Sequence, residues 1–88
     1  KDVFDGMRKG VATNRAQFFW DFTTAFYGFN REGAKVSEAL QRFYFQMAMM
    51  GGIQSQIDCI REFSESDFRA DLQKIDLPTL VIHGDDDQ

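Results

Sequence analysis

The fold of this chain is decided by its carboxyl-terminal stretch, Leu77-Pro78-Thr79-Leu80-Val81-Ile82-His83-Gly84-Asp85-Asp86-Asp87-Gln88. The run from Thr79 to Ile82 is apolar without alternation, which predicts a strand over 79–82 that is buried on both faces, as in a parallel sheet. Pro78 disfavours helix in the residue before it, so the helical part of the chain is expected to end by Leu77. Gly84 and the aspartates predict a turn at the carboxyl edge of the sheet, where open α/β folds place their chemistry.

No other segment of the chain has a strand pattern. A single parallel strand leaves its backbone N–H and C=O groups unpaired unless other strands flank it. The chain also starts without Met and ends on acidic turn residues, and 88 residues support only a marginal core. We therefore expect an α/β fold of which these residues are a fragment, mostly helical by itself, with one buried strand that joins a sheet supplied from elsewhere.

The amino-terminal part is predicted to be helical, because its apolar residues recur at steps of three, four or seven. A helix capped by Asp2 is expected over 2–22, either bent or divided at Thr13-Asn14. Two glycines and an asparagine then predict a loop over 27–33.

Two further helices and a short helical turn are predicted after this loop. Ser37 is the expected N-cap of the first helix, which Gly51-Gly52 ends. The second helix runs from Ile53 to Phe63 with its isoleucines on one face. Ser66 or Asp67 is expected to cap the turn that follows.

Charge and cysteine content limit the classes of partner and compartment. The chain has 10 Lys and Arg against 14 Asp and Glu, a net charge of −4 without a basic patch, which argues against nucleic acid or an anionic membrane as partner. No apolar run approaches the length of a membrane span. A single cysteine, Cys59, permits no internal disulfide and fits a cytoplasmic protein, in which it is expected to be a buried small hydrophobe.

Five blocks of sequence, in order, resemble one branch of the α/β-hydrolases. The stretch 77–88 is similar to the strand and turn that carry the acid of the catalytic triad in that fold. With the four upstream blocks, the chain resembles the cofactor-free (non-haem) chloroperoxidase and arylesterase family over nearly its whole length. Those blocks are Asn14-Arg15-Ala16-Gln17-Phe18, Phe26-Tyr27-Gly28-Phe29-Asn30, Asp58-Cys59-Ile60 and Phe63-Ser64-Glu65-Ser66-Asp67-Phe68-Arg69-Ala70-Asp71-Leu72.

This resemblance implies two parts, a helical cap over 1–65 and a return to the hydrolase core over 66–88. The acid of the family's triad is the third residue after the glycine, which falls on Asp87. Its role would be to accept a hydrogen bond from the catalytic imidazole and to stabilise the imidazolium. From spacing alone, the three aspartates read more simply as a solvated acidic turn, and a metal site is disfavoured because no further oxygen ligands gather.

The other members of the triad are expected outside these residues. In this fold the chain order is serine, acid, histidine, so the nucleophile would precede residue 1 and the base would follow residue 88. No serine of the chain lies in a Gly-x-Ser-x-Gly elbow. The one histidine, His83, is not at the family's catalytic position, and we expect it to have a structural role.

Three phenylalanines, Phe22, Phe26 and Phe63, match the family's substrate-lining cap residues by their place in the blocks. Small-molecule pockets are mainly apolar and exclude water, which fits aromatic rings on the underside of a cap. Five other aromatic residues are expected to be core between the cap helices or between cap and sheet, namely Phe4, Phe18, Phe43, Tyr44 and Phe68.

The resemblance implies part of a serine hydrolase that acts on small esters or carboxylic acids without a cofactor. An acyl-serine intermediate would give esterase activity with water and a peracid with hydrogen peroxide, the latter accounting for halogenation without haem or metal. Its partners would be the rest of its own chain and a second copy in a homo-oligomer, and the 88 residues alone would be inactive. Two alternatives stay open, a helical interaction module and a dienelactone or carbon–carbon bond hydrolase of the same fold.

Overall fold

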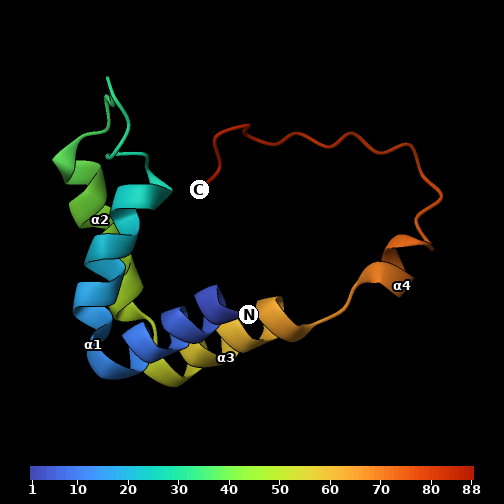
Figure 1. The fold of residues 1–88 in the computed structure, drawn as a ribbon, viewed down its shortest axis with the longest axis horizontal. Coiled ribbons are helices and arrows are strands. Elements are labelled where there is room, and N and C mark those ends of the chain that lie inside the picture. The colour runs from blue at the N-terminus through green and yellow to red at the C-terminus, as the bar shows by residue number, and fades with distance from the viewer.

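The computed structural model describes residues 1–88 as four helices and a long extended tail (Figure 1). The helices are α1 (Asp2–Phe26), α2 (Glu38–Met50), α3 (Ile53–Glu65) and the single turn α4 (Arg69–Leu72). Helix α3 lies along the first half of α1 and α2 lies along its second half, which gives an L-shaped helical unit. None of the four helices combines the length and the apolarity needed to cross a bilayer.

Helix α1 is bent at Asn14, which confirms the predicted bend. Asn14 has non-helical angles (φ −155°, ψ 84°), and its Oδ1 accepts a hydrogen bond from the Gln17 amide at 3.1 Å, so it caps the second half of the helix. The bend also lays the Phe18 ring over Gly10, where an added Cβ would come within 2.6 Å of the ring. The predicted Asp2 cap is wrong, because the helix begins at Asp2 and no side chain caps it.

The predicted cap and end of α2 and the predicted start of α3 are confirmed, whereas α3 continues to Glu65, two residues beyond its predicted end. Side-chain hydrogen bonds connect the bend of α1 to the junction between α2 and α3. Ser37 Oγ accepts the Leu40 amide at 3.3 Å, and Gly51 follows the last residue of α2. From the bend, Arg15 donates to the Gly51 carbonyl at 2.6 Å. Gln56 Nε2 of α3 donates to the Ala48 carbonyl of α2 at 2.6 Å. These bonds attach the bend of α1 and the first turn of α3 to carbonyls at the end of α2.

The core of the helical unit is small. Only Val11, Ile60 and Thr23 are buried, and the radius of gyration is 15.9 Å against about 12 Å for a compact domain of this length. The buried Thr23 hydroxyl donates to the Trp20 carbonyl and accepts from Gln41 Nε2, both at 2.6 Å, so it joins α1 to α2. Residues 1–88 therefore leave many large apolar side chains exposed to water.

The predicted buried strand over 79–82 is not formed within these residues. The segment is extended without ladder partners, and its side chains are among the most exposed of the chain, with Leu80 84% and Ile82 86% accessible. A strand is defined by hydrogen bonds to a neighbour, and residues 1–88 provide none. The turn predicted after it is present at Asp85 and Asp86.

Several burial predictions are wrong for the helical unit. Phe43 and Phe68, expected in the core, are 57% and 59% exposed, and Cys59 is exposed as well. Phe4, Phe18 and Tyr44 are only partly buried. Helices α2 and α3 each have an apolar face, and α1 is the one helix that packs against each of them. Because each apolar face is wider than its contact with α1, part of it stays exposed.

Candidate functional site

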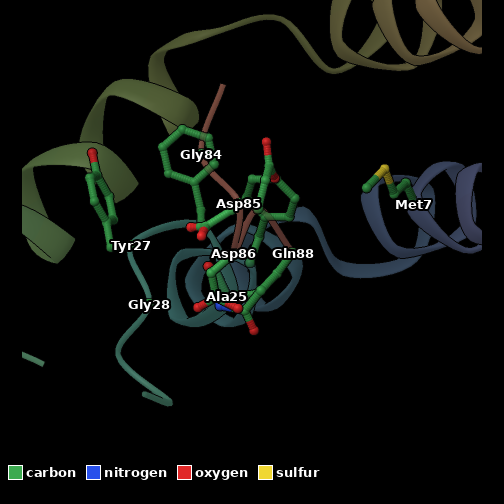
Figure 2. Close-up of a pocket in the computed structure, with 11 residues that line it drawn as sticks. Met7, Ala25, Tyr27, Gly28, Gly84, Asp85, Asp86 and Gln88 are labelled. Atoms are coloured by element: carbon green, nitrogen blue, oxygen red, sulfur yellow. The ribbon is translucent and has the colours of Figure 1, made fainter. Parts of the chain in front are cut away.

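A pocket of about 970 Å³ lies between the end of α1 and the acidic turn of the tail (Figure 2). One wall consists of Phe22, Phe26 and Tyr27 at the end of α1, and the other consists of residues 84–88. Phe22 and Phe26 are one helical turn apart and so point to the same side of α1. The structure therefore brings Asp87 together with two of the three predicted substrate-lining phenylalanines.

The aromatic wall continues from α1 onto α2. The ring centroids of Phe22 and Phe26 are 5.6 Å apart, and Phe26 lies 5.3 Å from Tyr44 and 5.1 Å from Tyr27. These are favourable distances for aromatic pairs. Burial raises the pKa of the Tyr44 phenol, and the neighbouring Tyr27 raises this pKa further. The Tyr44 phenol therefore stays neutral well into alkaline conditions.

The carboxylate of Asp87 is exposed and lies beside an imidazole of its own turn. Its Oδ2 is 3.2 Å from His83 Nε2, while His83 Nδ1 is 2.6 Å from the Gly84 carbonyl oxygen. Each ring nitrogen of His83 therefore lies close to one oxygen atom. The contact joins two residues of the same turn and leaves the Asp87 carboxylate largely exposed.

The acidic turn is attached to the end of α1 by residues that sequence reasoning missed. Arg31 donates two hydrogen bonds to Asp86, and Asn30 exchanges amide hydrogen bonds with Gln88. Asn30 belongs to one of the quoted sequence blocks, but neither contact could be found from spacing, because each joins residues more than 50 positions apart. The sequence offered one signal for an ion pair here, the opposite charges of Arg31 in the predicted loop and the three aspartates at 85–87.

Phe63 does not reach this pocket. It lies on α3, packs edge-on against Phe4 at 5.5 Å, and borders a separate shallow hollow with Cys59 and Phe68. No group of three or more histidine, cysteine or acidic side chains is placed to hold a metal ion in residues 1–88. The arrangement at Asp87 is thus a carboxylate facing an aromatic wall across an open pocket.

The comparisons with known proteins point to one group of enzymes. No protein-family model matches the chain. The chain is 49% identical to a non-heme haloperoxidase of Rhodococcus erythropolis and 51% identical to a non-heme chloroperoxidase of Streptomyces lividans, in each case over 99% of its own length. It is 46% identical over its whole length to the bifunctional esterase/perhydrolase DCH of Acinetobacter calcoaceticus. The chain spans 32% of the length of each of these relatives. Over that third, its similarity supports the family of non-heme haloperoxidases and esterase/perhydrolases.

Proposed function

We propose that residues 1–88 are the helical cap, over 1–65, and the acid-bearing return to the core, over 66–88, of a serine hydrolase with the α/β-hydrolase fold. The observation that carries this proposal is the pocket in which Asp87 faces Phe22 and Phe26. The relatives named as haloperoxidases and as an esterase/perhydrolase supply the reaction class. Asp87 is the triad acid, and the aromatic wall is the underside of the cap.

In the proposed reaction the serine and the histidine come from the rest of the complete chain. Asp87 accepts a hydrogen bond from the imidazole, which takes the serine proton as the hydroxyl attacks the ester carbonyl and later protonates the leaving alcohol. Water then releases the carboxylic acid from the acyl-serine. Hydrogen peroxide in place of water releases a peracid, which oxidises a halide to hypohalous acid and returns the carboxylic acid.

The exposed tail fits this proposal. Leu80 and Ile82 are side chains of the kind buried on both faces of a parallel strand, yet they lie almost fully in water here. In the complete enzyme a neighbouring strand would pair with residues 79–82 and hold Gly84 at the carboxyl edge of the sheet. Asp87 would then lie where α/β folds place catalytic groups.

A serine-directed reagent tests the reaction class. In the complete chain, phenylmethylsulfonyl fluoride is expected to abolish both aryl acetate hydrolysis and peroxide-dependent bromination in acetate, in parallel and to the same residual level, since one acyl-serine serves both. Each activity is followed against time of modification. Bromination that persists after hydrolysis is lost would contradict a shared serine and would remove peracid formation from the proposed function.

Phe26→Ala is expected to raise KM for an aryl acetate by about tenfold, because it removes an aromatic face worth roughly 1–2 kcal/mol of apolar contact with the substrate. The change in kcat is expected to be small, since the ring contacts the substrate equally before and during reaction. Phe43→Ala is the matched control, because Phe43 is exposed to the same extent on α2 and does not border the pocket. Equal KM values for the two variants would remove Phe26 from the site.

A further inference from the structure

The two residues that flank Asp87 are both held by the turn that follows α1. On one side, Arg31 Nε donates to Asp86 Oδ2 and an Arg31 terminal nitrogen donates to Asp86 Oδ1, both at 2.7 Å. This is a parallel two-bond pairing, in which the planar guanidinium sets the orientation of the carboxylate as well as its distance. It makes Asp86 the best-held carboxylate of the acidic turn.

On the other side of Asp87, Gln88 is held by two groups at the end of α1. Asn30 Nδ2 donates to Gln88 Oε1 at 2.9 Å, and Gln88 Nε2 donates back to Asn30 Oδ1 at 3.2 Å and to the Ala25 carbonyl at 3.1 Å. The Ala25 carbonyl also accepts the Gly28 amide at 3.1 Å, so Gln88 is a second donor to this carbonyl at the end of α1. Asp87 therefore lies between two anchored neighbours, while its own carboxylate is held by neither anchor.

The turn that carries these anchors has a defined shape. Gly28 and Gly33 have φ of +69° and +72°, a region that other residues rarely adopt. Backbone bonds from Phe29 to the Thr24 carbonyl at 2.9 Å and from Arg31 to the Gly28 carbonyl at 3.0 Å close the turn. The guanidinium of Arg31 is thereby presented from a fixed backbone rather than from a free loop.

The hydrogen bonds of Arg31, Asn30 and Ala25 attach residues 76–88 to α1 and the turn that follows it. The other side-chain hydrogen bonds of residues 76–88 are local. We infer that Arg31 is a positioning residue, which acts through Asp86 to set the place of Asp87 against the aromatic wall of the pocket. This inference rests on the proposed role of Asp87. An exposed ion pair adds little to stability, so its removal should change the position of the acid more than the folding of the protein.

The test uses the complete chain that carries residues 1–88, with aryl acetate hydrolysis and thermal unfolding as measurements. Arg31→Gln is expected to lower kcat by about 10- to 100-fold with little change in KM or Tm, because small displacements of a catalytic group have effects of that size. Arg31→Lys is expected to recover only part of kcat, since an ammonium keeps the charge but not the two-bond geometry. The double variant that exchanges the pair, Arg31→Asp with Asp86→Arg, is expected to have a higher kcat than either of its two single variants.

Arg61→Gln is the control, because Arg61 also forms exposed ion pairs, with Asp58 and Glu62, but lies on α3 away from the pocket. An unchanged kcat in Arg31→Gln, together with an inactive Asp87→Asn variant, overturns the positioning role and leaves the triad proposal intact. An active Asp87→Asn variant overturns both. If Arg31→Gln lowers Tm, the double variant with Arg31 and Asp86 exchanged is the deciding test. A double variant that folds but has no higher kcat than the single variants overturns the inference.

Discussion

Asp87→Asn is expected to lower kcat for aryl acetate hydrolysis by about 10⁴-fold in the complete chain, with KM nearly unchanged. An amide cannot stabilise the imidazolium that forms when the serine proton is taken, and its NH₂ group favours the wrong imidazole tautomer. Asp87 lines the pocket and contacts His83 of its own turn. Asparagine has nearly the same shape as aspartate, so the substitution removes the charge and keeps the shape of the side chain. Initial rates over a range of ester concentrations separate kcat from KM.

The control for this prediction is Asp71→Asn. Asp71 is an exposed carboxylate that pairs with Lys74 at 3.3 Å and lies outside the pocket, so the same change of charge should leave kcat unaltered. Equal rates for the wild-type protein and the Asp87→Asn variant would show that the acid of the triad lies elsewhere. The pocket at the end of α1 would then lose its proposed role in the reaction.

Val11→Asp is expected to produce the largest loss of stability, about 3–5 kcal/mol in the free energy of unfolding. Val11 lies on α1 and is completely buried, so an aspartate there would be a charge removed from water. Because only three residues of the helical unit are buried, no other contact can compensate for its loss. Urea unfolding followed by helical circular dichroism measures the change.

Val3→Asp provides the matched control on the same helix. Val3 is 68% exposed, so the same substitution should change the free energy of unfolding by no more than about 0.5 kcal/mol. Similar urea midpoints for the two variants would mean that the packing around Val11 does not hold the helical unit together.

Much of the local structure follows from neighbouring residues along the chain. The Ser37 cap, the glycines after α2 and the bend at Asn14 were predictable because each depends on contacts within four residues. The same local reasoning misplaced the first cap, since the helix starts at Asp2 itself. Most helix limits are therefore predictable to within about two residues, as is usual for the ends of helices. The exception is the end of α1, which reaches Phe26, four residues beyond the predicted end at residue 22.

Burial could not be predicted in the same way. The apolar spacing of α2 shows that Phe43 and Tyr44 lie on one side of the helix, but it does not show how much of that side a neighbour covers. Phe43 is exposed while Tyr44 is partly buried, because Tyr44 alone meets Phe26 of α1. Cys59 is exposed for a similar reason, since α3 is covered only along its Ile60 face.

The amino-acid order alone determined the helices, the acidic turn and the candidacy of Asp87, because these depend on short-range propensity and on a recognisable motif. Only the tertiary structure placed Asp87 opposite Phe22 and Phe26, and only it showed that Arg31 binds Asp86. Those contacts join residues more than 50 positions apart, so they depend on the bend of α1 and the path of the tail. The extended segment 79–82 shows the same division: its strand-forming residues are evident in the chain, but a strand exists only where another backbone accepts its hydrogen bonds.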